Sequence, residues 1–280
     1  MFSTPKKSDG TPSSRRPPGP SQSFSAPQGN PEPLPTPTNT SESEFPGPKD
    51  IRRMGVVAAL GAMNDEIQSK FRGNHSSHPA ETVRSFIDLF KAGLTSQHQF
   101  VFAVWDQYKP DEKVLPKLEM KKNEADLLQP APREGERVIV AVGILQAPKH
   151  APEVKDEAEF DRFPDVSKSE NLEISDTAGK KDLDNKLQTI ISPLKIEAYG
   201  SIELLLAHPS YGPDQQAKMI VREFKAITRL ERIPLLALAT NVDKENIYER
   251  TAFEELPKEG LEFSNDEEAK EFSVMLFHSD

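Results

Sequence analysis

The side chains able to carry out acid–base, nucleophilic or metal chemistry are scattered along this 280-residue sequence. His75 and His78 are three residues apart, a spacing that can bind zinc from one helical face, but no cysteine or nearby carboxylate pair completes a site. The remaining histidines stand apart from one another: His98, His150, His208 and His278. The Gly-x-Ser-x-Gly turn of serine hydrolases is absent too. We therefore predict no catalytic residue, no metal site and no cofactor, and a protein that is not an enzyme.

Two short motifs have the residue types of a nucleotide-binding site. Residues 176–179 (DTAG) and 241–244 (NVDK) are similar to the elements with which small GTPases contact the γ-phosphate and the guanine. A phosphate-binding loop also requires Gly-x4-Gly-Lys-Ser/Thr, because its backbone N–H groups and its lysine surround the phosphates. Gly179-Lys180 is followed by a second lysine and has Ile174 where the first glycine belongs. The pattern therefore argues against nucleotide hydrolysis.

Composition excludes several further classes of protein. The chain carries 45 Asp+Glu against 35 Lys+Arg, a net charge of -10, which is unsuited to a general coat on nucleic acid. The absence of cysteine excludes a disulfide framework, a thiolate zinc site and an iron–sulfur cluster. No apolar run approaches the roughly 20 residues that span a bilayer, and the N-terminus lacks the apolar core of a secretory signal.

Residues 1–48 are predicted to be a disordered tail. The first 50 residues hold 12 of the 25 prolines and almost no aliphatic side chains, so the tail cannot bury enough apolar surface to offset its conformational entropy. Two basic pairs, Lys6-Lys7 and Arg15-Arg16, are its candidate contacts: they suit a nuclear localisation signal or an anionic membrane surface, or have no specific role. A proline-rich partner motif is the second candidate: Pro33, Pro35, Thr36 and Pro37.

Residues 49–280 are predicted to form one α+β domain, with mixed helices and a small sheet. Helices are expected at 51–63, 79–91, 213–232 and 243–256, and strands at 137–146, 194–208, 235–240 and 271–277. Residues 99–108 are apolar enough for either a buried helix or a buried strand. Residues 147–185 are acidic and proline-interrupted, which predicts a mobile loop.

Two details of the helices lead to specific expectations. In the helix from Pro213, the apolar residues Ile220, Phe224, Ile227 and Leu230 are expected to pack on the strands at 138–146 and 202–206. Arg52 and Arg53 occupy the first turn of the first helix, where the helix dipole disfavours cations. They are either a solvated helix start or residues that serve a partner.

The order of these elements, with residues 199–204 (YGSIEL), resembles the matrix protein of rhabdoviruses. That family has a flexible basic and proline-rich tail followed by one α+β domain with a long exposed loop. The resemblance implies a plant-infecting type, because the net charge of -10 disfavours simple electrostatic binding to membranes.

The function predicted from this resemblance is a non-enzymatic viral structural and assembly protein. It would link the nucleocapsid or nucleoprotein to an anionic membrane surface and to further copies of itself, without sequence-specific nucleic-acid binding. Its location would be the virion beneath the envelope, and the host cytoplasm or nucleus. Two alternatives remain open: a viral phosphoprotein that serves the polymerase and the nucleoprotein, and a host adaptor protein.

Overall fold

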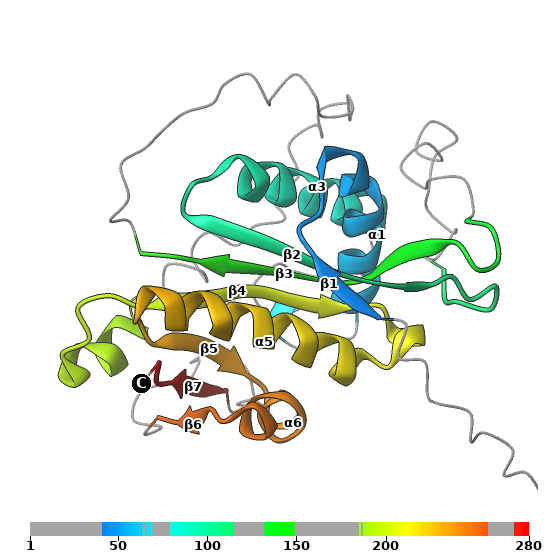
Figure 1. Ribbon diagram of the computed structural model, residues 1–280. Helices are drawn as coiled ribbons and strands as arrows, with labels where there is room; N and C mark the ends of the chain where they lie inside the picture. Colours follow the sequence, from blue (N-terminus) through cyan, green and yellow to red (C-terminus); the bar gives the residue numbers. More distant parts are fainter. Residues whose placement is uncertain are drawn as a thin grey trace, which may run out of the picture. The chain divides into compact units, whose positions relative to one another are not determined.

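A mixed β-sheet forms the centre of the part of the chain that the computed structural model describes, namely residues 41–63, 65, 67–68, 79–114, 132–148, 185, 187–256 and 272–279. Its strands are β1 (Glu42–Glu44), β2 (Gln99–Gln107), β3 (Arg137–Gln146), β4 (Gly200–Ala207), β5 (Leu235–Ala239), β6 (Glu254–Glu255) and β7 (Ser273–Phe277). They lie in the order β1-β2-β3-β4-β5-β7-β6 (Figure 1). Within these residues β4 and β5 pair in parallel, and the other neighbours are antiparallel.

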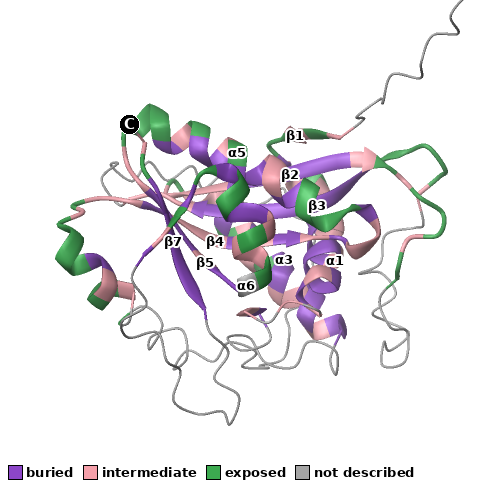
Figure 2. Cartoon of the chain, turned by 90° about the horizontal axis from the view of Figure 1, so that it is seen from below, coloured by how far each residue is buried: buried purple, intermediate pink, exposed green. Residues whose placement is uncertain are grey.

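Helices cover both faces of this sheet (Figure 1). On one face lie α1 (Ile51–Ala62) and α3 (Pro79–Thr95), whose apolar side chains pack with one side of β2, β3 and β4. On the other face lies α5 (Pro213–Glu231). Because β3 is covered on both sides, its sequence is a continuous apolar run rather than an alternating one. Figure 2 shows the resulting buried residues along the central strands. The α+β class is thus confirmed.

Short helical turns make up the remaining regular structure. These are η1 (Pro48–Asp50), η5 (Ser192–Leu194), η6 (Pro209–Tyr211), α6 (Asn241–Asp243), the π-helical turn η7 (Lys244–Tyr248) and η8 (Glu249–Thr251). The last three replace most of the helix expected at 243–256, which ends when the chain turns at Ala252 with a φ of 60°. Ile247 and Phe253 nevertheless point inward, as expected.

The inward face of α5 differs in part from the expected one. Ile220 and Phe224 are fully buried against β3, where a Cβ added at Gly143 would lie 2.5 Å from Ile220 Cγ2. Leu230, however, is 83% exposed, so its predicted place in the core is wrong. In the last turn Thr228 takes the inward position, and its hydroxyl donates to the Lys225 carbonyl at 3.2 Å. A threonine whose hydroxyl is hydrogen-bonded to the backbone can be buried in a core, and the spacing of apolar residues does not predict such a position.

Three strands owe their form or their place in the sheet to neighbouring strands. Residues 99–107 form a strand, since they pair with β1 on one side and β3 on the other. The last strand lies between β5 and β6 rather than at an edge of the sheet, and it is buried along its whole length. β1 falls inside the segment expected to be disordered, so the structured body already includes residues 42–44.

Several predictions fall outside the described residues. These are the tail contacts Lys6, Lys7, Arg15, Arg16, Pro33, Pro35, Thr36 and Pro37, the histidines at 75 and 78, residues 176–179, and nearly all of the loop at 147–185. Among the described helices, none combines the length and the apolar character needed to cross a membrane.

Candidate functional site

The parallel strands β4 and β5 separate after a short stretch of pairing. Gly200 pairs with Leu235 and Ile202 with Ala237, and no further β4 residue has a partner in β5. At the same point the register between β3 and β4 shifts: Leu145 pairs with Ile202 but Ile144 pairs with Leu204, which leaves Glu203 as a bulge. A bulge bends and twists its strand. The two arrows accordingly diverge toward their tips in Figure 1.

This separation leaves an unusual strand edge inside a sheet. From the bulge to Ala207, β4 still pairs with β3, while β5 turns to β7 alone. Among the described strands, the N–H and C=O groups of β4 that face β5 beyond Ile202 therefore have no ladder partner. An extended molecule with amide groups can pair with such an edge as an added strand does.

The turn between β4 and α5 lies at the tip of that edge. It comprises His208 and η6, and ends at Gly212, whose φ of +67° is a conformation that favours glycine. Pro213 then begins α5 without an N–H group, and Asp214 places a carboxylate in the first turn. The N-terminus of a helix attracts anions through free N–H groups and its dipole. Here proline and aspartate weaken that attraction.

A buried polar cluster, the Glu112 cluster, holds this turn in place. It consists of Arg53, Glu112, His208 and Tyr211. The Arg53 guanidinium donates to both carboxylate oxygens of Glu112 at 2.8 Å and to the Ile139 carbonyl at 3.0 Å. The Tyr211 hydroxyl donates to Glu112 Oε2 at 2.7 Å and accepts from the Lys109 N–H at 2.9 Å. The cluster thus ties α1, the segment after β2 and the turn before α5 together.

Burial sets the charge states within the Glu112 cluster. Desolvation alone would raise the pKa of Glu112, but the hydrogen bonds from Arg53 and Tyr211 outweigh it and lower that pKa. The imidazole of His208 is fully buried, and desolvation lowers its pKa to about 4 despite the nearby Glu112. Its Nδ1 accepts from the Ser210 N–H at 3.2 Å, so its Nε2 carries the proton and donates to the Lys113 carbonyl at 3.1 Å. His208 is therefore neutral at pH 7.

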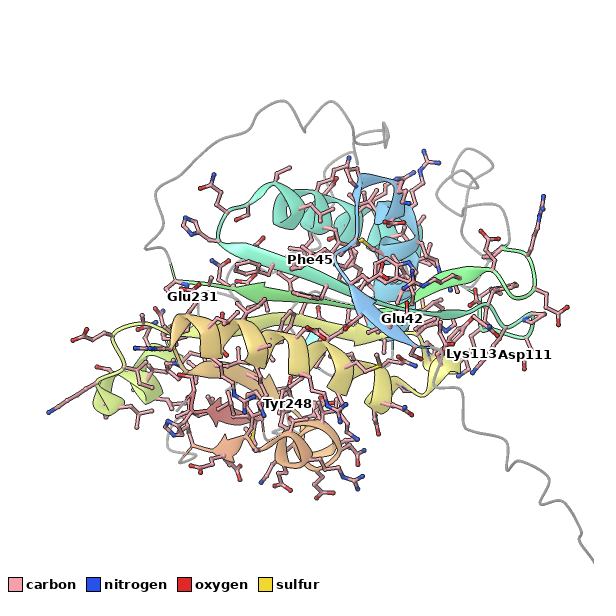
Figure 3. All side chains as sticks on the ribbon, in the orientation of Figure 1. Glu42, Phe45, Asp111, Lys113, Glu231 and Tyr248 are labelled. Atoms are coloured by element: carbon pink, nitrogen blue, oxygen red, sulfur yellow. The ribbon has the colours of Figure 1, made fainter. Side chains whose placement is uncertain are left out.

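Two lysines lie beside the turn. Lys109 donates from Nζ to the Ser210 carbonyl at 3.3 Å, and the Lys113 N–H donates to Ser210 Oγ at 2.8 Å. Figure 3 labels Lys113 with Asp111 at the end of the molecule where β4 ends and α5 begins. The turn thus has cations near it even though its own first helical turn is acidic.

Tyr248 lies after β5, in η7, and is buried in the apolar cluster that also contains α5. Burial, Asp243 and Asp65 all raise the pKa of its hydroxyl, so the phenol keeps its proton. Asp65 follows α1, which packs on the other face of the sheet, and Asp243 follows β5. Their shared influence on Tyr248 shows that segments from both faces meet near the end of β5.

Glu203 is the one ionisable residue of β4. It sits at the bulge, is half-buried, and accepts a hydrogen bond from Gln99 Nε2 at 3.2 Å. Among the described residues no group of three or more His, Asp or Glu side chains is placed to hold a metal ion.

The sequence by itself indicates few of these residues. It shows His208 only as one of several isolated histidines, and Arg53 only as a cation at an unfavourable place in a helix. The structure explains that place, because the partner of Arg53 is Glu112 of the same chain. Nothing in the sequence connects the two, since they are 59 residues apart.

The architecture resembles that of solved acetyltransferases. A protein described as arylalkylamine N-acetyltransferase 7 from the mosquito Aedes aegypti matches with a TM-score of 0.50 and 15% identity, over 86% of this chain and 88% of that one. This chain shares its fold with that protein. At such low identity the likeness shows the fold alone.

Two further acetyltransferase-fold structures are less similar, and no argument depends on them. Mosquito arylalkylamine N-acetyltransferase-like 5b has a TM-score of 0.47 and 10% identity, covering 85% of this chain and 99% of that one. A histone acetyltransferase and related acetyltransferase from Corynebacterium glutamicum has a TM-score of 0.45 and 11% identity, covering 84% and 94%. No protein-family model and no curated protein matches the sequence.

The acetyltransferase fold corrects the function predicted from the sequence. The resemblance to rhabdovirus matrix protein is wrong, because it rested on element order and on residues 199–204. Here residues 200–204 begin the bulged strand β4 of a sheet that this chain shares with the Aedes aegypti protein. The non-enzymatic assembly role falls with it, as do the phosphoprotein and adaptor alternatives. So do the predicted partners: a nucleocapsid or nucleoprotein, an anionic membrane and further copies of the chain. The location inferred from the same resemblance stays an untested prediction.

Proposed function

We propose that this protein is an acyl-CoA-dependent N-acyltransferase. The observation that carries the proposal is the bulge at Glu203 together with the end of β4–β5 pairing after Ile202, within a fold shared with a protein described as an arylalkylamine N-acetyltransferase. The acyl donor would be a thioester of coenzyme A, and the acceptor a primary amine.

The acyl donor would lie along β4. Its pantetheine arm carries two amide groups, which suit the N–H and C=O groups that β4 presents beyond the bulge. Its phosphates would lie near the turn at His208–Gly212, with Lys109 and Lys113 supplying the positive charge. Because the negative charge of Asp214 opposes this positive charge, we expect the affinity for the acyl donor to be lower than that of a glycine-rich turn without an acidic residue.

Acyl transfer to an amine needs a proton acceptor and a donor to sulfur. The amine nitrogen attacks the thioester carbonyl and forms a C–N bond; breaking the C–S bond releases the thiolate. Glu203, at the bulge, is the carboxylate best placed to take the ammonium proton. The released thiolate then takes up a proton from solvent, because Tyr248 is buried and its raised pKa makes it too weak an acid to supply one.

Titration calorimetry with acetyl-CoA, followed by a thiol-release assay on a panel of arylalkylamines and peptide N-termini, tests the proposal. Wild-type protein should bind acetyl-CoA and release thiol with at least one amine. Glu203→Gln should lower kcat about a hundredfold or more while leaving the Kd for acetyl-CoA unchanged. Glu254→Gln, an exposed carboxylate on β6, is the matched control and should retain activity. Failure of the wild-type protein to bind acetyl-CoA would reject the proposal.

A further inference from the structure

The cations of α5 and its C-terminal cap form one line along the helix, which we call the α5 stripe. It consists of Lys218, Arg222, Lys225, Arg229 and Arg232. Their spacing alternates between four and three residues, so all five lie on the same side of the helix. Arg222, Arg229 and Arg232 are exposed, Lys218 is half-buried, and the stem of Lys225 is buried.

None of these cations forms an ion pair within the described part of the chain. The described cations that do are elsewhere; among them Arg53 pairs with Glu112, Lys91 with Asp88, Arg137 with Glu42 and Glu44, and Lys244 with Glu255. Burial, Arg229 and Arg222 together lower the pKa of Lys225, because neighbouring like charges disfavour its protonated form. Lys225 instead donates to the Thr251 carbonyl and lies 4.0 Å from the centre of the Phe277 ring.

Such a line of like charges destabilises the helix that carries it. Like charges three and four residues apart cost a few tenths of a kcal/mol per pair, and the dipole compensates only in the last turn, at Arg229 and Arg232. The chain has more acidic than basic residues, and acidic side chains in alternate positions would have removed the repulsion. Lys225 and Arg229 are partly compensated by the Phe277 ring, at 4.0 and 5.0 Å from its centre. The charge of Lys218, Arg222 and Arg232, for which the described residues supply no ion pair or ring contact, therefore points to an anionic partner.

The dimensions and surroundings of the α5 stripe favour a peptide. Between Lys218 and Arg232 the helix rises about 21 Å, which matches about six residues of extended chain. Glu231 adjoins one end of the stripe, and Glu249 belongs to η8, which packs against α5. These carboxylates and the net charge of -10 repel any anionic partner. The repulsion is greater for a nucleic acid or a membrane, whose negative charge is continuous, than for a short acidic peptide segment.

We propose that the α5 stripe docks an acidic, extended segment of a partner protein. The contacts of the stripe within the chain are with Thr251 and with Phe277 of β7 rather than with β4, so this interaction goes beyond the proposed reaction. It would bring a partner or an acidic protein substrate to the enzyme through charge complementarity, which raises the association rate and sets specificity.

Fluorescence anisotropy with a labelled peptide of about ten alternating glutamate and serine residues provides the test. The double variant R222E/R232E reverses two exposed cations for which the structure shows no ring contact. It should weaken peptide binding about tenfold, and raising the salt concentration should weaken the binding of wild-type protein. The control K49E/R133E makes the same charge change at two exposed cations elsewhere and should bind within about twofold of wild type.

Three outcomes would overturn the proposal. One is unchanged peptide binding by R222E/R232E. Another is tighter binding of a single-stranded RNA oligonucleotide or of phosphatidylserine vesicles than of the peptide, lost in the same variant. The third is loss of acetyl-CoA binding in R222E/R232E, which would assign the stripe to the acyl-donor site. If the reversal lowers the melting temperature, R222Q/R232Q keeps the fold and should still weaken peptide binding.

Discussion

Arg53 and Glu112 form a bidentate ion pair that is almost entirely shielded from water. Both N···O distances are 2.8 Å, and the side chains are 12% and 6% exposed. The pair joins the first turn of α1 to the segment after β2, and Tyr211 extends it to the turn before α5. A site at the end of β4 is therefore positioned by residues from three distant parts of the sequence.

Removing the charge of Glu112 should strongly destabilise the protein. Glu112→Gln leaves the Arg53 guanidinium buried without a counter-charge, which should lower the free energy of unfolding by about 3–5 kcal/mol. Chemical denaturation measures this. Arg137→Gln breaks a pair of similar length with Glu42 and Glu44 at the surface and should cost at most about 1 kcal/mol. Equal losses in the two variants would contradict the argument from burial.

Stability should fall as the pH is lowered from about 7 to 4, because of His208. Its pKa is about 4 in the folded protein and near 6.5 when unfolded, so over this range the unfolded state binds more protons. The stability that the neutral imidazole contributes, about 3 kcal/mol, is thus complete above pH 6.5 and lost through pH 4. Denaturation midpoints at successive pH values measure the effect.

The matched variant for this pH dependence is His208→Gln, which does not titrate. Its stability should be lower than that of wild type at pH 7 but nearly constant between pH 7 and 5. Because the pKa of Glu112 is lowered, a further loss below pH 4.5 should persist in both proteins. A variant that kept the full slope between pH 7 and 5 would show that another group is responsible.

Truncation of the two apolar residues Phe224 and Leu230 of α5 should affect stability to very different extents. Phe224 is fully buried and its ring meets that of Phe102 edge-on, so Phe224→Ala should cost about 3–5 kcal/mol. Leu230 is 83% exposed, and Leu230→Ala should change stability by less than about 0.5 kcal/mol. Thermal melting of both variants decides whether α5 faces the sheet as described.

Asp214 should weaken acyl-CoA binding while it stabilises α5. Asp214→Asn removes a negative charge from the helix N-terminus, which should lower stability by about 0.3–1 kcal/mol. The same change should tighten acetyl-CoA binding about threefold, because it removes repulsion of the phosphates. Glu231→Gln, at the opposite end of α5 (Figure 3), should leave the affinity unchanged. An unaltered Kd in Asp214→Asn would place the phosphates elsewhere.

The elements with strong local patterns were predicted well. The β-branched run at Arg137–Gln146 forms β3 with those bounds, and Pro213 begins α5 as its fixed φ suggests. Where the pattern was ambiguous, as at 99–108, the neighbouring strands decided the outcome. Element order alone then led to the wrong family, because many folds share one succession of helices and strands and differ in how the strands pair.

The sequence by itself determined the α+β class, the main strands and helices, and which faces of most of them are buried. These follow from periodicity, since a helix or strand places its apolar residues at fixed intervals. Only the tertiary structure decided that β4 and β5 pair in parallel and part at Glu203, and that Arg53 meets Glu112. Such contacts join residues far apart in the chain, and their energy depends on burial and geometry that exist only once the chain has closed on itself.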